Sequence, residues 1–296
     1  MNGKISVIIP TIEEESVFDI IKELRSQFGS KLELIIVDKS SLKYHERLKA
    51  TKAMVLRQKD SGVENAIMQG LRAASGDLIA SIDGDATHEI DGIARAVKIV
   101  ESGEADFVLG NRFGKLEKGA MSPHLVIGNK AISKVYSQMY GTNVHDVLTG
   151  LFVMTREAFE SIRNVKPYRA GIAFFAIELA KRGYKVTEVP IHYYPRASGE
   201  SKLAKSKLFY GAQVTSHIIR LARDYNPLLI FGGLGAILLI CGLGLSAYVV
   251  YTFVTTGQFT LIGRSLIAFM LITVGILSII AGFILDLLLE IAKKLE

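Results

Sequence analysis

The sequence predicts an α/β domain with a mostly parallel sheet, followed by interfacial helices and two transmembrane helices. Residues 1–112 alternate short β-rich runs with amphipathic helical patterns, which is typical of a parallel sheet covered by helices. Near the C-terminus, residues 228–254 and 265–285 contain no charged side chain. Each of these segments exceeds the roughly 20 residues that a helix needs to cross a bilayer.

The N-terminal part is expected to contain strands at residues 5–9, 34–37, 53–56, 78–82 and 106–109. Three helices are expected between these strands. The first ends at Gly29 and the second covers residues 62–74. The third covers residues 89–101, with Ile93, Val97 and Val100 on its buried face. The buried face of the first helix is predicted to consist of Val17, Ile20, Ile21, Leu24 and Phe28.

The alternation of strands and helices ends after residue 112. Residues 129–140 and 205–225 each place apolar side chains on one side of a helix and basic or polar ones on the other. Both helices could pack on the sheet, but the second leads directly into the first apolar segment, which favours the membrane surface. The predicted boundaries are a cytoplasmic domain at 1–204, a juxtamembrane helix at 205–226 and a transmembrane hairpin at 227–296.

Basic residues predict how the hairpin is oriented. Arg220 and Arg223 precede the first apolar segment, and Lys293 and Lys294 follow the second, whereas the connection at 255–264 has one Arg. Because cytoplasmic flanks carry the excess of Lys and Arg, both termini are expected in the cytoplasm. The N-terminus lacks the features of a signal peptide. The sequence therefore predicts a multi-pass protein of the cell membrane with its N-terminal domain in the cytoplasm.

Composition excludes several classes of protein. The only cysteine, Cys241, lies within the first apolar segment, so neither a disulfide nor a cysteine metal site is expected. A net charge of +6 suits a domain that binds anionic lipid headgroups and phosphates. Nucleic acid would explain the charge equally well, but the apolar segments argue against it. These segments contain no charged side chain, which argues against ion or proton transport. Their glycines allow close helix contact in a tight hairpin or a homo-oligomer.

Two carboxylates follow the expected strand at 78–82. Asp83 and Asp85 flank Gly84 at the carboxyl edge of the sheet, where α/β folds bind their ligands. Mg²⁺ and Mn²⁺ prefer oxygen ligands and commonly take one or two carboxylates together with substrate phosphates. The pair therefore predicts a metal site that holds a nucleotide diphosphate, the alternative being a solvated acidic turn.

Eight motifs occur along the chain in a characteristic order. They are VIIPT at 7–11 with Glu14, IVD at 36–38, AASGD at 73–77, DGD at 83–85, GNR at 110–112, DVLTG at 146–150, EVP at 188–190 and RASGESKL at 196–203. In this order they resemble the family-2 glycosyltransferases of the dolichyl-phosphate mannose synthase type. The resemblance covers about residues 4–210.

The resemblance implies a Rossmann-like GT-A fold that binds a nucleotide diphosphate sugar and uses Mg²⁺ or Mn²⁺. It implies that Asp83 and Asp85 hold the metal. The residues implied to act in catalysis are Asp85, Arg112, Asp146, Arg196 and Lys202. Those implied to bind the nucleotide sugar are Pro10, Ile12, Glu14, Val37, Asp38, Asp83, Gly84, Asp85, Arg112, Arg196 and Lys202.

The implied acceptor is a polyprenyl or dolichyl phosphate at the lipid bilayer. A lipid phosphate is largely ionised at neutral pH, so it can attack without a strong general base, and in-line attack inverts the anomeric centre. Metal and basic side chains stabilise the departing diphosphate and bring two anionic reactants together. Asp146 is expected either to orient the sugar or the acceptor, or simply to form a turn.

The chain departs from the family pattern at several positions. Ile12 replaces an aromatic residue, and Lys39 replaces an acidic one, which leaves GDP-mannose and UDP-glucose both open. Thr87 stands in place of a Gln in the metal motif, and His88 is expected behind the site or at the surface rather than as a ligand. The positions implied to grip the acceptor phosphate fall at His124 and Gly128, so Asn129 or Lys130 could take that role.

Two alternatives remain open. A transferase acting on a neutral lipid or a polysaccharide would need a carboxylate base, and processive synthases usually add a Gln-x-x-Arg-Trp motif. The chain contains no Trp, which favours the phosphate acceptor. A non-catalytic membrane adaptor or a small transporter would have lost the metal carboxylates or the basic loop, yet the sequence retains both.

Overall fold

The computed structural model of the chain describes residues 3–167, 171–196, 227–257 and 262–295. The chain divides into two compact units, Met1–Thr215 and Ser216–Glu296. The predicted juxtamembrane helix at 205–225 lies outside the described residues. That helix and the predicted domain boundaries therefore stay predictions.

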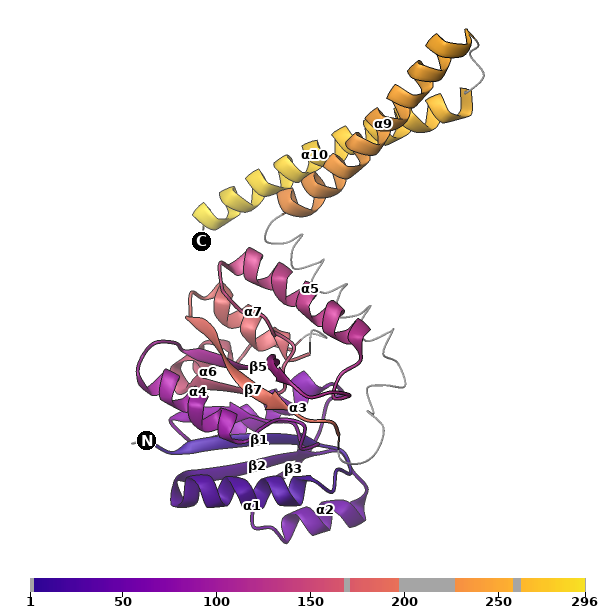
Figure 1. The fold of residues 1–296 in the computed structure, drawn as a ribbon. Coiled ribbons are helices and arrows are strands. Elements are labelled where there is room, and N and C mark those ends of the chain that lie inside the picture. The colour runs from indigo at the N-terminus through magenta and orange to yellow at the C-terminus, as the bar shows by residue number, and fades with distance from the viewer. Residues whose placement is uncertain (1–2, 168–170, 197–226, 258–261, 296) are drawn as a thin grey trace. The chain divides into compact units, whose positions relative to one another are not determined.

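A seven-stranded sheet forms the centre of the first unit, in the order β3-β2-β1-β4-β6-β5-β7 (Figure 1). Strand β6 runs antiparallel to both of its neighbours, and every other pair of strands is parallel. The predicted mostly parallel sheet is therefore confirmed. The strands are β1 (Ile5–Thr11), β2 (Leu32–Asp38), β3 (Met54–Arg57), β4 (Leu78–Ser81), β5 (Phe107–Leu116), β6 (Phe152–Thr155) and β7 (Val186–Tyr193).

Helices cover both faces of this sheet. One face packs against α1 and α4, whose apolar side chains join those of alternate strand residues in a single core cluster. On the other face lies α3, where Gly70 allows close approach to Ile8 and Val37. The helices are α1 (Val17–Phe28), η1 (Gly29–Lys31), α2 (Leu42–Lys49), α3 (Val63–Ala73), α4 (Asp91–Glu101), α5 (Pro123–Tyr140), α6 (Arg156–Ile162) and α7 (Ala173–Lys181).

The three helices expected between the strands are present as α1, α3 and α4, and the one expected at 129–140 is part of α5. The buried faces predicted for α1 and α4 are confirmed. Helix α1 ends at Gly29, whose φ of 54° suits a residue without a side chain. The sequence patterns missed α2, α6, α7, β6 and β7. Helix α7 is buried from Ala173 to Leu179, so it has no polar face to give a helical period. Strand β6 has only four residues, which is too short for a recognisable alternation.

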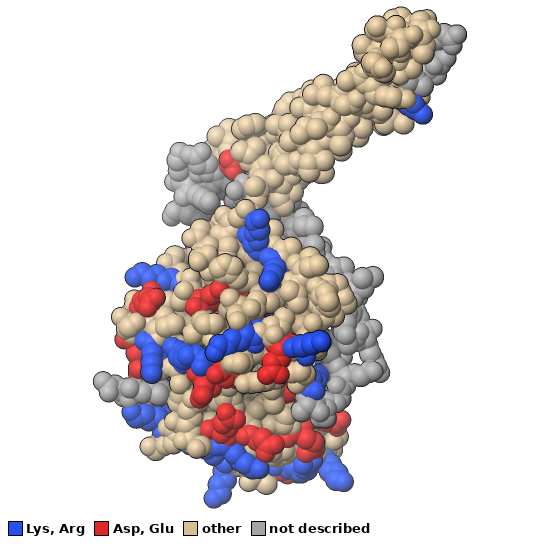
Figure 2. All heavy atoms as spheres, viewed as in Figure 1, with Lys and Arg blue, Asp and Glu red and all other residues tan. Residues whose placement is uncertain are grey.

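The second unit is a helical hairpin. A π-helical turn, η3 (Leu228–Gly232), leads into α9 (Gly233–Thr256), and α10 (Ile262–Leu295) returns beside it. Residues Leu228–Thr256 and Ile262–Leu288 are long and apolar enough to cross a membrane, and only 11% and 17% of their most apolar windows are buried. A core helix of a soluble protein would be mostly buried. On the face seen in Figure 2, the described residues of this hairpin show few charged side chains.

Glycines bring the two helices of the hairpin together. A Cβ on Gly235 would lie 2.5 Å from the carbonyl oxygen of Gly275, and a Cβ on Gly242 would lie 2.7 Å from Ile272. Ser278 on α10 also donates a hydrogen bond to the Phe231 carbonyl at 2.7 Å. The tight hairpin that these glycines allow is therefore formed within one chain. The homo-oligomer stays a prediction.

Glu33 at the start of β2 accepts hydrogen bonds from Lys4, Ser6 and Ser75. Burial opposes ionisation of this carboxyl, but the hydrogen bonds outweigh it and lower the pKa of Glu33 from 4.5 to about 2. Since the folded-state pKa is the lower one, this stability is complete above pH 4.5 and is lost as the pH falls towards about 2.

We expect Glu33→Gln to lower the free energy of unfolding by about 1–3 kcal/mol near neutral pH, because charged hydrogen bonds are lost. Thermal unfolding of the detergent-solubilised protein should show the deficit shrinking as the pH falls below 4.5. Glu23→Gln, at an exposed position on α1, is the control and should unfold like the wild type. A deficit of constant size between neutral pH and about pH 3 would contradict the assignment.

Candidate active site

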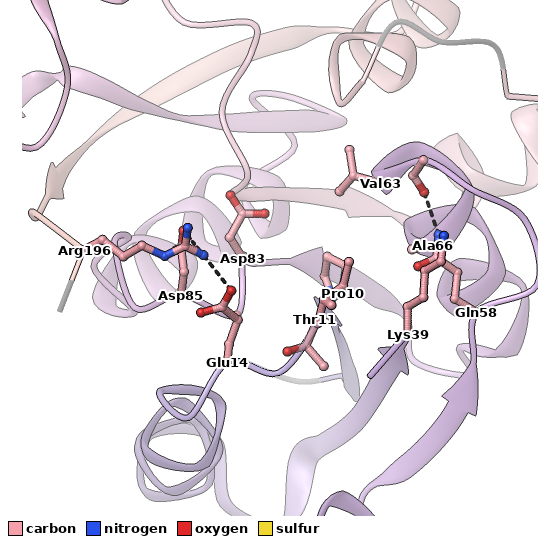
Figure 3. Close-up of a pocket in the computed structure, with 13 residues that line it drawn as sticks. Pro10, Thr11, Glu14, Lys39, Gln58, Val63, Ala66, Asp83, Asp85 and Arg196 are labelled. Carbon is pink, nitrogen blue, oxygen red and sulfur yellow. Dashed lines mark hydrogen bonds and ion pairs between the residues drawn. The ribbon is translucent and has the colours of Figure 1, made fainter. Parts of the chain in front are cut away.

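A cavity of about 290 Å³ opens at the carboxyl edge of β1, β2 and β4 (Figure 3). Its walls come from the end of β1, from the segments that follow β1, β2, β3, β4 and β7, and from the start of α3. It is lined by seven of the residues predicted to bind the nucleotide sugar, namely Pro10, Ile12, Glu14, Asp83, Gly84, Asp85 and Arg196. The remaining lining residues are Thr11, Lys39, Gln58, Gly62, Val63 and Ala66.

Strand register places the two loops of the site side by side. Strands β1 and β4 are parallel neighbours, with Ile8 opposite Ser81, so the loops after them leave the same edge of the sheet. Ser16 donates a hydrogen bond to the Gly84 carbonyl at 2.8 Å and joins the loops. Gly84 has no room for a side chain, because a Cβ would lie 2.7 Å from Val17. The acidic turn is thus packed directly against the end of β1.

Asp83, Asp85 and His88 form a cluster whose potential ligand atoms all lie within 4.8 Å of one another. The Thr87 hydroxyl donates to Asp85 Oδ1 at 2.7 Å, so Thr87 holds one carboxylate from outside the cluster. His88 is only 4% exposed, with Nδ1 lying 3.9 Å from Asp83 Oδ2. The surface position allowed for His88 is therefore wrong, because its ring is enclosed beside both carboxylates.

The electrostatics of this cluster fit a divalent cation. Burial, reinforced by the negative charge of Asp85, raises the pKa of Asp83 to about 7. Two carboxylates that disfavour each other's ionisation would both be stabilised as anions by a cation between them. Their oxygen atoms are the donors that Mg²⁺ and Mn²⁺ prefer, with coordination left for substrate phosphates. The residues present therefore fit such an ion.

Arg196 brings positive charge into the cavity beside the acidic pair (Figure 3). Its Nη2 lies 2.7 Å from Glu14 Oε1 and 3.5 Å from Asp85 Oδ2. A guanidinium held at this distance from a metal site can also contact a diphosphate, because its planar donors match phosphate oxygens. Lys202, the second cation of the same motif, lies outside the described residues and stays a prediction.

Arg112 and Asp146 do not line the cavity but form a buried ion pair near it. Arg112 donates from Nε at 2.7 Å, from Nη2 at 2.8 Å and from its backbone N–H at 3.0 Å, all to the Asp146 carboxylate. Although burial disfavours its charge, Asp146 raises the pKa of Arg112. The guanidinium also lies over the Tyr193 ring, 5.3 Å from its centroid. The Asp146 carboxylate thus contacts Arg112 rather than the cavity.

Val37 and Asp38 lie behind the cavity and are not part of its lining. The Asp38 carboxylate is fully buried, at 2.9 Å from the Ser40 N–H, 2.8 Å from the His45 ring and 3.0 Å from Arg57. The wall is formed instead by Lys39, which follows Asp38, and by Gln58, which follows β3. The sequence interpretation missed three wall residues, Gln58, Val63 and Ala66. The only feature of the sequence near them that could have indicated a binding loop was Gly62, which was interpreted as the first residue of the helix at 62–74.

The fold and the site define a Rossmann-like GT-A domain with an acidic turn whose residues fit a divalent cation. Among solved structures, glucosyl-3-phosphoglycerate synthase from Mycobacterium tuberculosis, in complex with Mn²⁺ and uridine-diphosphate-glucose, is similar in fold. The TM-score is 0.57 at 20% sequence identity, covering 75% of this chain and 78% of that chain. The chain belongs to glycosyl transferase family 2, whose family model matches residues 6–163.

Curated relatives agree with this membership. Glycosyltransferase AglJ of Haloferax volcanii is 29% identical over 295 residues, which cover 98% of this chain and 95% of that protein. The dolichol-phosphate mannosyltransferase of Pyrococcus furiosus is 29% identical over 241 residues, 74% of this chain and 64% of that protein. The similarity to AglJ thus includes the part of the chain that forms the helical hairpin.

Proposed function

We propose that this protein is a metal-dependent, inverting hexosyltransferase that moves a sugar from a nucleotide diphosphate to a polyprenyl or dolichyl phosphate. The product would serve glycan assembly or protein glycosylation. The observation that carries the proposal is the convergence of Asp83, Asp85 and Arg196 on one cavity at the carboxyl edge of the sheet. GDP-mannose and UDP-glucose are the candidate donors.

Proteins similar to this chain support both the proposed lipid-phosphate acceptor and the proposed metal and nucleotide-sugar donor. The Pyrococcus furiosus relative is named for transfer of mannose to dolichol phosphate. The Mycobacterium tuberculosis synthase of similar fold was solved with Mn²⁺ and UDP-glucose. In the present chain, Asp83 and Asp85 would hold the metal, and His88 is close enough to complete its coordination.

Charge governs the proposed reaction. The leaving nucleoside diphosphate gains negative charge in the transition state, which the divalent ion would neutralise. Arg196, held by Glu14 and near Asp85, adds a fixed positive charge that favours the transition state over the ground state. Lys202 is proposed to act with it. The acceptor phosphate is already ionised, so no side chain has to remove a proton before attack.

The hairpin is proposed to anchor the domain at the bilayer, where the lipid acceptor resides. Helices α9 and α10 are long enough to span the hydrocarbon region and present large apolar side chains outward. Because basic residues flank both ends of the hairpin in the sequence, the two termini and the first unit are proposed to lie in the cytoplasm. This arrangement brings the phosphate of a membrane-embedded carrier to the same side of the membrane as the nucleotide sugar.

The proposal is tested by comparing two acceptors that differ only in the phosphate. Purified protein in detergent is incubated with radiolabelled GDP-mannose or UDP-glucose, and with either polyprenyl phosphate or the parent polyprenol. We expect label from one donor to enter polyprenyl phosphate and none to enter polyprenol. Transfer to polyprenol at a comparable rate would favour a neutral acceptor and contradict the proposed lipid phosphate.

A further inference from the structure

One short segment between α5 and β6, residues 144–150, contacts both charged parts of the site. Asp146 in this segment holds the Arg112 guanidinium with bonds of 2.7 and 2.8 Å. At its other end, Gly150 lies directly against Asp83, because a Cβ on Gly150 would come within 2.0 Å of Asp83 Oδ2. The path of this segment therefore sets the position of Arg112 and limits that of the Asp83 carboxylate.

Glu188 on β7 fixes the beginning of the segment. Its Oε2 accepts the backbone N–H of His145 at 2.7 Å and that of Asp146 at 3.3 Å. Its Oε1 lies 2.7 Å from His145 Nδ1 and accepts from the Asn111 amide at 2.8 Å. Because Asn111 directly precedes Arg112 on β5, Glu188 holds both partners of the buried ion pair in place.

Two serines on α5 hold the same segment from the other side. Ser137 Oγ accepts the Val144 N–H at 3.0 Å and donates to the Val144 carbonyl at 2.6 Å. Ser133 Oγ accepts the Val147 N–H at 3.0 Å. The segment is thus fixed on α5 by neutral hydroxyls and on the sheet by one carboxylate, and the carboxylate is the only charged anchor among these three.

We propose that Glu188 is a positioning residue of the active site, which acts through residues 144–150 on Arg112 and on Asp83. It lines neither the cavity nor the acidic cluster. The Glu188 carboxylate faces three N–H groups and the His145 ring nitrogen. Since the N–H groups are divided between Oε1 and Oε2, both of these atoms must accept hydrogen bonds. Glu188→Gln keeps the size of the side chain but turns an NH₂ group towards these donors, and the segment must shift.

This inference rests on the proposed metal-dependent transfer, so its test includes a measurement other than activity. We expect Glu188→Gln to weaken Mn²⁺ binding by about 10–100-fold, as loss of a residue supporting a metal site usually does. Mn²⁺ binding to the full-length protein in detergent, with UDP or GDP present, can be measured by electron paramagnetic resonance. The KM for the nucleotide sugar should rise in parallel, because metal and diphosphate bind together.

Glu33→Gln is a matched control, because Glu33 also accepts four hydrogen bonds and its side chain is 14% exposed, against 13% for Glu188. Glu33 lies at the start of β2, away from the carboxyl edge that carries the site. The two variants should lose similar stability, and only Glu188→Gln should lose Mn²⁺ affinity. Equal Mn²⁺ affinity and equal KM in both variants would overturn the inference and leave Glu188 a purely structural residue.

A second variant covers the case in which Glu188→Gln does not fold. Gly150→Ala acts at the other end of the segment, where the added methyl group would crowd Asp83. We expect it to weaken Mn²⁺ binding as well, and unchanged affinity would contradict the inference. Failure of the wild-type protein to bind Mn²⁺ would instead contradict the proposed function, so the two failures are distinguishable.

Discussion

Asp85→Asn is expected to lower the rate of sugar transfer by about a thousandfold. The substitution keeps the shape of the side chain but removes the negative charge that the proposed metal needs. It also replaces one oxygen by an NH₂ group, a poor ligand for Mg²⁺ or Mn²⁺. The turnover of purified protein with saturating nucleotide sugar and polyprenyl phosphate measures the effect.

Asp19→Asn is the control for this substitution. Asp19 is an exposed carboxylate on α1 whose side chain contacts Lys22, so the variant loses the same charge away from the cavity. It should retain the wild-type rate. A rate for Asp85→Asn within a few-fold of that of Asp19→Asn would show that Asp85 does not hold an essential metal.

Asp146→Ala is expected to reduce the free energy of unfolding by about 3–5 kcal/mol, the usual cost of leaving a buried charge without its partner. The Arg112 side chain is only 9% exposed, and Asp146 accepts three of its hydrogen bonds. The loss can be measured by chemical or thermal unfolding in detergent. Transfer activity should also fall, because Arg112 is no longer held near the acidic pair.

A double variant separates the stability lost by leaving a buried charge unpaired from the stability lost through poorer packing. Replacing Arg112 and Asp146 together by Met and Leu should restore much of the stability lost in Asp146→Ala, since no buried charge remains. Transfer activity should stay low, because the positive charge is gone. Glu160→Ala, which breaks an exposed pair with Arg163, should change stability far less. Equal losses in Asp146→Ala and Glu160→Ala would contradict the importance assigned to the buried pair.

The position of the acidic pair at the carboxyl edge of the sheet could be predicted because it follows from local patterns. Strand β1 is an apolar run that ends at Thr11, and β4 is an apolar run that ends two residues before Asp83. The carboxyl ends of parallel strands lie at one edge, so their loops must meet. The apolar face of α1 was equally visible, since its period of 3.6 residues needs no knowledge of the rest of the fold.

Contacts between distant segments could not be predicted in this way. Asp146 and Arg112 are 34 residues apart, and nothing in either local pattern shows that they form a buried pair. Glu188 appeared only as part of a motif, without its bonds to His145 and Asn111. Asp38 follows an apolar strand as Asp83 does, but Arg57 and its other partners on neighbouring segments draw its carboxylate away from the cavity.

The most direct test of the proposed function is the metal dependence of hexose transfer to polyprenyl phosphate. Wild-type protein purified in detergent is first treated with EDTA and then supplied with Mg²⁺ or Mn²⁺, while radiolabelled lipid is counted. The proposal predicts no labelled lipid after EDTA and full recovery when either ion returns. Transfer that continues unchanged in EDTA would contradict the assignment of Asp83 and Asp85 as the metal-binding pair of the transferase.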